Sequence, residues 1–497
     1  MKSSVLFSAL AVLPLLAVSA IKDTCEVVES TTKIEVHRRF TLAYTAEQNE
    51  YWSTACSALK PACILYPKTT GEVAHIVNIL KTNSEVFAIK SGGHNPNDYF
   101  SSVEGGPLIS TNKLNQVKLD KNAGTVRVGP GNRWEDVLGA LDGTGFTVVG
   151  GRIGNVGVGG LLLGGGLSFL TAQHGWAVNS VLEFEVVLAN GTAVTASKTQ
   201  NPDLFAALRG GGNNFGIVTS FLLKAYPQGQ IWGGSMVFLH TTETAATLLK
   251  AVRDFTEYCD DEKAALVLTA VKGVGLIDLW IMFAFYDAPN PPTEVFANFT
   301  AAGTLVNTCK TQSYASLLSA NNAGVIKGSI YTIGTETMPL PSTQDGAEVM
   351  GAFHSHWRSV ASSVQTVPGV VANVAYQPFS KRMARIARAN GGDVMDIDDD
   401  VDRIILELNY SFWFKLDREQ IDQAMVSTYK GFRNLVEQFQ GSGKLPEAYL
   451  PLFMNDGYYR QDIFGRLHPA KRELAKEVAA SVDPQGMWKE RTGGFKP

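Results

Sequence analysis

Glycine is concentrated in three short stretches of this 497-residue chain, and their spacing constrains the fold more than any other feature. The chain has 48 glycines, and the stretches in question lie at 92–93, 154–166 and 210–216. A residue without a side chain allows left-handed backbone conformations and lets a ligand approach the main-chain amides closely. We therefore expect three loops to converge on one bulky ligand that carries two anionic groups.

The residues around these loops predict alternating helices and strands. Apolar positions at helical spacing predict a helix over 71–83, and 86–89 is typical of a short buried strand that ends just before the first glycine pair. The Asn-Gly pair at 190–191 predicts a hairpin between strands at 183–189 and 192–197. A glycine pair directly after a strand places backbone amides where they bind an anion.

The chain beyond residue 228 differs in composition and in its pattern of apolar residues. Residues 229–449 contain fewer glycines and alternating strands such as 404–414, with helices predicted over 242–259, 344–360 and 419–439. This pattern is typical of an antiparallel α+β unit. The last segment is aromatic-rich and then helical. The sequence as a whole predicts an α+β protein.

The first twenty residues are organised like a secretory signal peptide. Lys2 precedes an apolar run from Val5 to Val18, and small residues follow up to Ala20. That run is shorter than the roughly 20 residues that a membrane helix needs. The uncharged stretch 153–170 is too rich in glycine to form a membrane helix. We therefore expect a protein that is secreted, extracellular or in the cell wall, with no membrane span.

Charge and known motifs exclude several classes of protein. Lys and Arg number 43 against 47 Asp and Glu, without a basic block, so no nucleic-acid partner is expected. P-loop, nucleophile-elbow and zinc-helix motifs do not occur in the sequence. Gly210-x-Gly212 with Gly216 misses the spacing of a dinucleotide fingerprint by one residue.

Two further patterns imitate metal sites. The acidic run at 396–402 has Val401 where a calcium loop needs glycine, so we interpret it as a solvated turn. His354-x-His356 has no third ligand nearby, and we interpret the pair as two histidines on a helix surface. No metal site is predicted.

The cysteines and glycosylation sequons are compatible with a secreted protein. Five cysteines follow the predicted cleavage site, at Cys25, Cys56, Cys63, Cys259 and Cys309. An oxidising compartment favours disulfides, and the odd number leaves at least one thiol free. Fifteen two-bridge patterns are possible, and the spacing does not choose among them. Glycosylation sequons occur at Asn190, Asn298 and Asn409.

The glycine stretches belong to an ordered series of motifs that resembles a known family. The series is Lys90-Ser91-Gly92-Gly93-His94, Gly151 followed by Val156-Gly157-Val158-Gly159-Gly160, Gly164-Gly165-Gly166, His174-Gly175 and Gly210 to Thr219. It is similar to the flavin lobe of the berberine bridge enzyme-like FAD-linked oxidoreductases, which are PCMH-type members of the vanillyl-alcohol oxidase superfamily. The tail, with Asn455-Asp456 and Gly493 to Lys496, resembles the secreted fungal branch. The likeness is strong over 51–227, good in the tail and loose between them.

The resemblance implies an architecture and a cofactor. Residues 57–228 would form a two-lobed PCMH-type FAD-binding domain to which 450–497 returns, and 229–449 would form an antiparallel-sheet substrate domain with helices. His94 would bond the flavin 8α-methyl group, with Ser91, Gly92, Gly93 and Asn95 on the pyrophosphate. The remaining cofactor positions implied are Val156, Gly157, Gly159, Gly160, Gly216, Ile217 and Asn455.

Two positions in the second glycine stretch refine this expectation. Ile153 stands where the family carries a cysteine as its second flavin tether, so the resemblance implies a single covalent bond. Val156 occupies a position where, in this family, valine tends to accompany oxygen-reactive oxidases and leucine tends to accompany dehydrogenases. The resemblance therefore implies an oxidase.

The sequence offers three candidates for the catalytic base. Glu407, Asn409, Ser411 and Trp413 share one face of a predicted strand, and we expect that face to look toward the flavin, which would leave Asn409 without a glycan. Candidates for the base that accepts the substrate proton are Glu407, Tyr458 and Tyr459. The alternatives are an edge-strand charge facing water for Glu407 and aromatic packing at a domain seam for the tyrosines. We favour a tyrosine, because the tail matches the family better than the middle does.

The resemblance also implies disulfide partners. Fungal relatives pair a cysteine near the mature N-terminus with one in a Pro-x-Cys context, which implies Cys25–Cys63 here. A Cys259–Cys309 bond within the substrate domain is the second expectation, and it leaves Cys56 free.

The function expected from these observations is that of a secreted, monomeric FAD oxidase. It would take a hydride from a small organic substrate, such as a fungal alkaloid or polyketide, and pass the electrons to molecular oxygen. A flavin-dependent oxidative cyclase, a carbohydrate oxidase and a secreted flavin-binding protein without turnover remain as alternatives.

Overall fold

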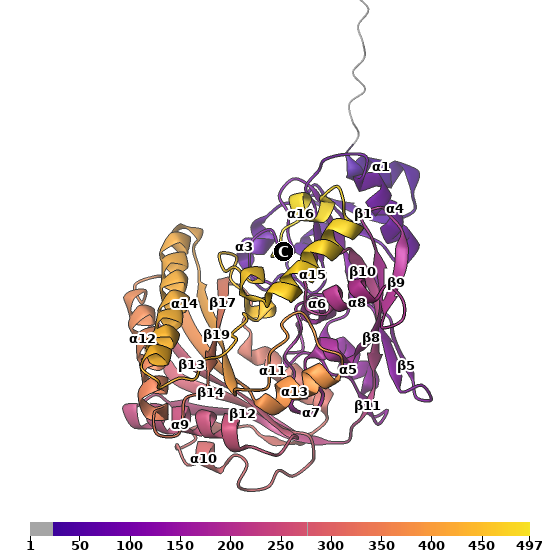
Figure 1. The fold of residues 1–497 in the computed structure, drawn as a ribbon. Helices are drawn as coiled ribbons and strands as arrows, with labels where there is room; N and C mark the ends of the chain where they lie inside the picture. Colours follow the sequence, from indigo (N-terminus) through magenta and orange to yellow (C-terminus); the bar gives the residue numbers. More distant parts are fainter. Residues whose placement is uncertain (1–22, 276) are drawn as a thin grey trace, which may run out of the picture.

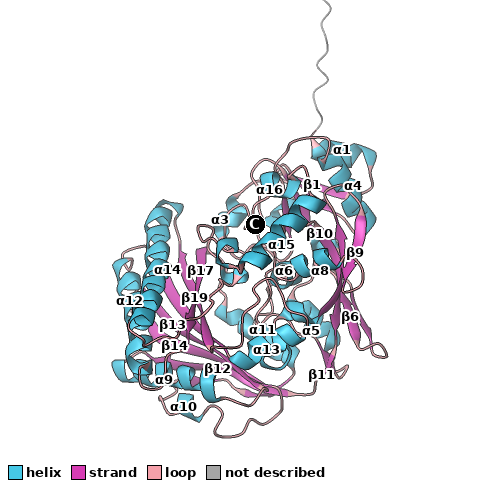
Figure 2. Ribbon diagram, viewed as in Figure 1, coloured by secondary structure: helices cyan, strands magenta, loops and turns pink. Residues whose placement is uncertain are grey.

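The structure is a computed structural model that describes residues 23–275 and 277–497. The predicted signal peptide, residues 1–20, lies outside the described residues. Helices and strands are mixed along the chain, and two of the sheets are extensive and antiparallel (Figures 1 and 2). The predicted α+β class is confirmed.

The first half of the chain forms two main sheets. The first has the order β1-β2-β4-β3, with bounds Glu35–Arg38, Cys63–Tyr66, Pro107–Ser110 and Ala88–Lys90. The second has the order β5-β6-β10-β8-β9, with bounds Val117–Asp120, Thr125–Val128, Ile217–Lys224, Val181–Val187 and Ala193–Ser197. β8 and β9 form the hairpin predicted around residues 190–191. A short pair, β7 (Phe146–Thr147) and β11 (Tyr226–Pro227), lies apart from both.

Short helices connect these strands. They are α1 (Thr24–Thr31), α2 (Leu42–Gln48), α3 (Thr54–Ala58), α4 (Thr70–Leu80), α5 (Trp134–Leu141), α6 (Val158–Leu163), α7 (Thr171–His174) and α8 (Pro202–Leu208). α4 presents Val73, Ile76 and Leu80 to the core, at the helical spacing that predicted it. Each of these residues is fully buried.

The third sheet is the largest, and all of its strand pairs are antiparallel. Its order is β15-β12-β14-β13-β18-β19-β17, with bounds Val306–Asn307, Ile231–Leu239, Asp278–Tyr286, Ala264–Gly273, Val371–Phe379, Arg403–Phe412 and Ile330–Pro339; β16 (Lys310–Gln312) also pairs with β12. The helices from this part of the chain are α9 (Thr242–Tyr258), α10 (Ala297–Thr300), α11 (Tyr314–Asn321), α12 (Gly346–Ser363), α13 (Lys381–Ala389) and α14 (Arg418–Gly441).

The two faces of this sheet have different surroundings. α9, α12 and α14 cover one face and bury a large apolar cluster, to which alternate residues of β19 contribute, namely Leu406, Leu408 and Tyr410. Because side chains alternate across a strand, the residues between them point to the opposite face. That opposite face looks toward the glycine loops and forms one wall of the site described below.

The C-terminal segment returns to the first half of the fold. α15 (Pro469–Val482) and α16 (Met487–Arg491) lie beside the indigo and purple elements in Figure 1. The Arg491 guanidinium donates to the carbonyl oxygens of Leu80 and Glu85, at 2.9 and 2.7 Å. Trp488 packs edge-on against Phe87 with ring centroids 5.8 Å apart. The tail thus contacts the chain around α4 and β3.

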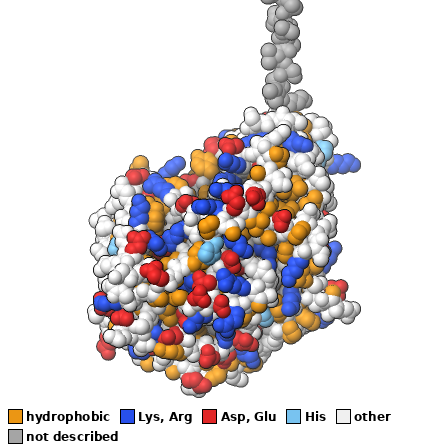
Figure 3. All heavy atoms as spheres, in the orientation of Figure 1, with side chains coloured by type: hydrophobic (Ala, Val, Ile, Leu, Met, Phe, Trp, Pro, Cys, Tyr) orange, Lys and Arg blue, Asp and Glu red, His pale blue; other side chains and the backbone are white. Residues whose placement is uncertain are grey.

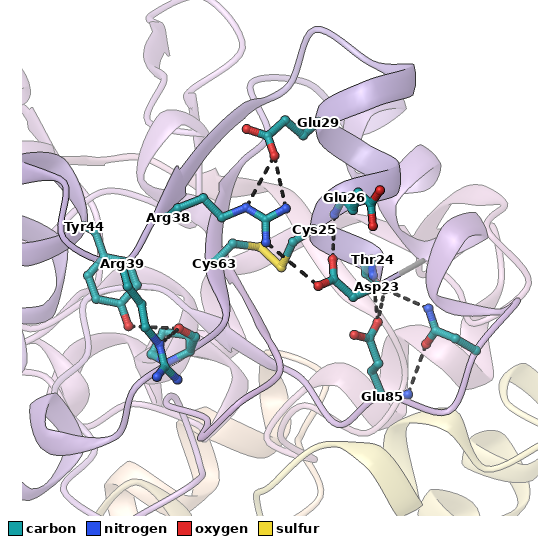
Figure 4. Close-up of a disulfide and its surroundings, with 12 residues drawn as sticks. Asp23, Thr24, Cys25, Glu26, Glu29, Arg38, Arg39, Tyr44, Cys63 and Glu85 are labelled. Carbon is teal, nitrogen blue, oxygen red and sulfur yellow. Dashed lines mark hydrogen bonds and ion pairs between the residues drawn. A yellow bond between two sulfur atoms is a disulfide. The ribbon is translucent and has the colours of Figure 1, made fainter. Parts of the chain in front are cut away.

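One disulfide is present among the described residues, and it is the first of the two expected. Cys25 in α1 is bonded to Cys63 in β2, beside Arg38 and its partner Glu29 (Figure 4). The expected Cys259–Cys309 bond is wrong, because both thiols are free. Cys259 follows α9 with its thiol near the Asp261 carbonyl, whereas Cys309 lies in the edge segment between β15 and β16. Cys56 is free, as expected, and it is buried.

Replacing Cys25 and Cys63 by serine should lower the free energy of unfolding by about 2–5 kcal/mol, because the bond closes a loop with a sequence separation of 38. Chemical denaturation of the oxidised proteins measures the loss. The matched control, Cys259→Ser with Cys309→Ser, removes two thiols but no bond. Equal losses in the two double variants would contradict a stabilising role for the disulfide.

His354 also differs from its expected position. It points from α12 into the interface with the third sheet, is only 5% exposed and stacks on Trp280 at 4.8 Å. Its Nε2 lies 3.2 Å from Nε2 of His240. The interpretation of His354 as a surface histidine is therefore wrong, because the apolar face of α12 buries it. His356 lies on another side of the helix, against the Ser427 carbonyl.

The outer surface shows no segregation of charge on the face in Figure 3, where Lys, Arg, Asp and Glu side chains are interspersed. No helix in the described part of the chain combines the length and hydropathy needed to cross a bilayer. Nor do His, Cys, Asp and Glu side chains gather in threes around a metal-sized space within residues 23–275 and 277–497.

Candidate active site

A cavity of about 580 Å³ lies between the glycine loops and the open face of the third sheet. All twelve positions for which the resemblance implies cofactor binding line it. These are Ser91, Gly92, Gly93, His94, Asn95, Val156, Gly157, Gly159, Gly160, Gly216, Ile217 and Asn455. The expected convergence of the three loops is therefore present in the structure.

The first two loops touch through their backbones. A Cβ placed on Gly157 would lie 2.3 Å from the Gly92 nitrogen, and one placed on Gly92 would lie 2.6 Å from the Gly157 Cα. The Ser91 hydroxyl crosses between the loops, donating to the Pro130 carbonyl at 2.6 Å and accepting from the Gly159 amide at 3.2 Å. Glycine at 92 and 157 is required because nothing larger fits.

Alanine at position 157 should separate the two loops. We expect Gly157→Ala to lower the free energy of unfolding by about 1–3 kcal/mol, as overpacking does, and to reduce bound flavin. Thermal unfolding and the ratio of flavin to protein absorbance measure both effects. Gly139→Ala is the control, since a Cβ there meets no atom within 4 Å and lies in helix α5. Normal flavin content in the Gly157→Ala protein would contradict the contact.

The tail secures the second glycine loop through Asn455. Its Nδ2 donates to the Gly160 carbonyl at 3.0 Å, and its Oδ1 accepts from the Gly166 amide at 3.0 Å. Asn97 joins the tail to the first loop by donating to the Gly457 carbonyl at 2.9 Å. Residues far apart in the sequence thus fix the same wall of the cavity.

A buried ion pair anchors the strand that leads to the first loop. The Lys90 ammonium in β3 donates to Oε1 of Glu47 at 2.6 Å, and the Ser110 hydroxyl donates to the same oxygen at 3.0 Å. The Tyr66 hydroxyl donates to the second oxygen at 3.1 Å. Because these donors satisfy the carboxylate, the pair can be buried without an unpaired charge. It fixes the end of β3 from which Ser91 and His94 follow.

His94 projects into the cavity from this loop. Its ring stacks on Trp52 at 4.5 Å, and Trp52 stacks on Tyr331 of β17 at 4.1 Å. Burial, aided by the Arg133 cation, lowers the pKa of His94 to about 3, so the imidazole is neutral at neutral pH. Its buried Nε2 has no hydrogen-bond partner among the described residues.

Cys56 supports the same loop from behind. Its sulfur lies 3.5 Å from the Pro96 carbonyl and 3.6 Å from the Asn95 carbonyl. Burial raises the pKa of the Cys56 thiol to about 12, so it stays protonated and can donate to these oxygens.

The opposite wall of the cavity comes from β19 and its neighbours. Glu407, Asn409 and Ser411 line it, as the period-two alternation predicted. Trp413 does not: it follows the end of β19, is 59% exposed and packs against Gly369, so its predicted orientation is wrong. Asn409 is only 6% exposed within the folded chain, which leaves no room for a glycan there. Asn190 and Asn298 are exposed.

Glu407 occupies an interior position of the sheet. β19 lies between β18 and β17, so the alternative of an edge-strand charge facing water is excluded. Burial raises the pKa of Glu407, and the Arg152 cation opposes that rise. A carboxyl group with a raised pKa is suited to accept and release a proton near neutral pH.

A charged cluster around Glu407 includes residues that the sequence reasoning did not select. Arg152 donates to Oε1 of Gln377, and Gln377 Nε2 donates to Asp456 Oδ2 at 3.1 Å. Burial and the neighbouring Glu407 carboxylate raise the pKa of Asp456 well above its ordinary range. Two sequence signals were available: Arg152 directly precedes a glycine-rich stretch without charges, and Asp456 follows Asn455 in the tail motif.

Neither candidate tyrosine reaches the cavity lining. Tyr458 is fully buried in the apolar cluster beneath α12 and α14, on the opposite face of the third sheet. Tyr459 is 38% exposed, and its hydroxyl donates to the Asp422 carboxylate at 3.0 Å. Burial strongly raises the pKa of Tyr458, which also disfavours its deprotonated form. Among the three candidates, Glu407 alone lies at the site.

The cavity has the features that binding FAD requires. Its glycine loops leave backbone amides accessible where a Cβ would collide with the opposite loop. A neutral histidine with an unsatisfied ring nitrogen stands at the same wall. We conclude that the residues present fit the cofactor implied by the motifs.

Comparison with known protein families gives an independent result. The profile of the FAD binding domain matches residues 61–197. An uncharacterized FAD-linked oxidoreductase of Arthroderma benhamiae is 44% identical over 468 residues, covering 93% of this chain and 92% of the relative. The FAD-dependent monooxygenase FUP4 of Fusarium proliferatum is 31% identical over 461 residues, covering 90% of this chain and 87% of the relative.

Solved structures share the fold at lower sequence identity. 6-Hydroxy-D-nicotine oxidase from Arthrobacter nicotinovorans superposes with a TM-score of 0.74 at 21% identity, covering 93% of this chain and 97% of that one. Glucooligosaccharide oxidase from Acremonium strictum, described with a 6-S-cysteinyl, 8α-N1-histidyl FAD, superposes with a TM-score of 0.75 at 19% identity, covering 96% and 99%. These likenesses establish the fold of the chain.

Proposed function

The chain belongs to the FAD-linked oxidoreductases, and we propose that it is a secreted oxidase that oxidises a small organic molecule and uses oxygen as the electron acceptor. The observation that carries the proposal is the shared cavity, lined on one side by His94 and the glycine loops and on the other by Glu407. When bound, FAD supplies the two-electron acceptor that takes a hydride from the substrate and passes the electrons to oxygen.

Each wall has its own task in this proposal. The backbone amides of the loops at 91–95 and 156–160 hold the pyrophosphate, and Asn455 keeps the second loop in place. His94 would hold the cofactor at its 8α carbon, because its neutral state leaves a ring nitrogen available as nucleophile. The new C–N bond would replace a C–H bond of the methyl group and the N–H bond of the ring, and the two electrons released would pass through the flavin to oxygen. Ile153 lines the cavity where relatives with a second tether would carry cysteine, so a single bond forms.

Glu407 is the proposed catalytic base. A substrate C–H bond adjacent to O–H or N–H gives up its hydride more readily when the attached proton is accepted. Arg152 and Asp456 set the charge around Glu407, so that one cation faces two carboxyl groups. Repulsion between two carboxylates favours the state in which Glu407 and Asp456 together hold one proton. With that proton on Asp456, Glu407 is ionised beside Arg152 and ready to accept.

Anaerobic mixing tests the proposal. The purified yellow protein is mixed without oxygen with alcohols, phenols, amines and sugars in turn, and the visible flavin absorbance is followed. An oxidase loses this absorbance with its substrate and regains it on admission of oxygen, with formation of hydrogen peroxide. If dithionite reduces the flavin but no compound does, the protein is a flavin-binding module and the proposal fails.

A second candidate reaction comes from the relatives, since one at 31% identity is named a monooxygenase. The product distinguishes the two reactions. An oxidase product has lost two hydrogens, an intramolecular cyclisation driven by oxidation shows the same loss, and a monooxygenase product gains an oxygen atom from labelled oxygen gas.

Secretion is part of the proposal and is supported by two observations. The first twenty residues have signal-peptide organisation, and Cys25 and Cys63 are bonded, which an oxidising compartment favours. N-terminal sequencing of protein from the culture medium should begin near Ile21. Retention in the cell with an intact Met1 would contradict secretion.

A further inference from the structure

The sheet wall of the cavity has its polar side chains along a narrow central band. Asn373 of β18 and Asn409 of β19 are direct cross-strand partners, and both line the cavity. Glu407 and Ser411 flank Asn409 on the same face of β19. We call these four residues the polar band.

Apolar side chains lie on both sides of the polar band. On one side Val271 is the partner of Asn373, and Ile281 and Phe283 follow on β14. On the other side Ile333 of β17 is the partner of Asn409. The flanking wall includes two further hydroxyls, those of Thr269 and Tyr331, and the Tyr331 hydroxyl already donates to the Ile326 carbonyl. The flanks otherwise offer few hydrogen-bonding groups to a ligand.

The two amides of the polar band have unused hydrogen-bonding capacity. Neither Oδ1 of Asn373 nor Oδ1 of Asn409 has a hydrogen-bond partner among the described residues, and both atoms are buried. Asn409 also interacts with the Glu407 carboxylate. A buried acceptor without a hydrogen-bond partner destabilises the protein. A ligand with an O–H or N–H group would remove this cost by donating to the amide oxygen, once the amide has turned toward the ligand.

We propose that Asn373 and Asn409 determine substrate specificity by accepting hydrogen bonds from a hydroxyl or N–H group on one edge of a largely apolar ring compound. The assignment rests on the proposed oxidase function, because it describes the substrate of that same site. Sugars fit this wall poorly: their hydroxyl groups point in all directions, and the apolar flanks would leave most of them without partners. The band also places the bound donor group beside Glu407.

Three ligands test this on the flavin-loaded wild-type protein without requiring turnover. 2-Naphthol offers a flat apolar body with one donor, 2-methylnaphthalene has nearly the same shape without the donor, and cellobiose represents a sugar. Equilibrium dialysis should give an affinity for 2-naphthol at least about tenfold above that for 2-methylnaphthalene. It should give no saturable binding of cellobiose. Equal affinities for the two aromatic ligands, or tighter binding of cellobiose, would overturn the assignment.

Variants then assign the preference to the two amides. In the Asn373→Leu, Asn409→Leu protein the two aromatic ligands should bind within about threefold of each other, while 2-methylnaphthalene binds as in the wild type. The control Thr269→Val removes a hydroxyl from the same wall and should keep the full preference. Persistence of the preference in the double variant would refute the role of the amides. Single Asn→Ser variants replace the double variant if it does not fold, and each should reduce the preference.

The outcomes separate this inference from the proposed function. A yellow protein whose flavin is reduced by cellobiose would contradict the inference and leave the oxidase function intact. A protein without flavin would contradict the function itself. Loss of flavin from the asparagine variants would show that the amides bind the cofactor rather than the substrate, which would also overturn the inference.

Discussion

His94→Ala protein is expected to lose its yellow colour completely on acid precipitation, whereas the wild-type precipitate stays yellow. The expectation rests on the proposed covalent bond. His94 is the side chain in the described cavity that matches the tether position implied by the motif, and Ile153 occupies the other tether position. The change in covalently bound flavin should be all or none. Absorbance of the washed precipitate, redissolved in denaturant, measures it.

A matched control distinguishes loss of the covalent bond from disturbance of the loop that carries His94. His94 stacks on Trp52, so Trp52→Leu disturbs the packing and keeps the nucleophile. It should retain covalent flavin, even with lower overall stability. Mass spectrometry of a wild-type peptide containing His94 should show the added mass of FAD. A colourless wild-type precipitate, or flavin on another residue, would contradict the tether.

The parts of the site that follow local rules were accessible from sequence. Glycine at 92 and 157 is required by a backbone contact, and such a requirement leaves a visible motif. Strand alternation correctly placed Glu407, Asn409 and Ser411 on one face, because a strand has a fixed period of two. It failed at Trp413, where the strand had already ended.

The parts that depend on which elements pack together were not accessible. Arg152, Gln377 and Asp456 come from three distant segments and form a cluster only once the third sheet faces the second glycine loop. The preference for a tyrosine base followed the quality of the motif match in the tail. In the structure, however, Tyr458 is buried on the helix-covered face of the third sheet. The local sequence has no periodicity that would predict on which face of the sheet this side chain lies.

The cysteine pairs show the same difference between what a motif predicts and what depends on the packing of distant segments. Cys25–Cys63 was available only from the family resemblance, since fifteen patterns fit the sequence equally. The Cys259–Cys309 pairing had no motif behind it, and the fold places one thiol after α9 and the other in an edge segment.

Glu407→Gln is expected to slow flavin reduction by at least about a hundredfold with the first substrate that reduces the wild-type enzyme, a loss typical of removing a general base. Glutamine keeps the shape and hydrogen-bonding reach of the side chain but cannot accept the proton. Because burial raises the pKa of Glu407, the wild-type rate should fall with decreasing pH at a value above the ordinary range of glutamate. In the variant this limb of the profile should disappear. Anaerobic stopped-flow absorbance across a pH series measures both effects.

Three comparisons decide whether the carboxylate is the base. Tyr458→Phe and Tyr459→Phe should each reduce the flavin at close to the wild-type rate, because neither hydroxyl lies at the cavity. Ser411→Ala changes the same strand face without removing a titrating group, and it should keep the pH profile. Arg152→Met should shift the limb to higher pH, since removal of the cation raises the pKa of Glu407 further. If Glu407→Gln retains both rate and profile while either tyrosine variant loses them, the base is the tyrosine, and its hydroxyl must reach the substrate by a movement of the tail.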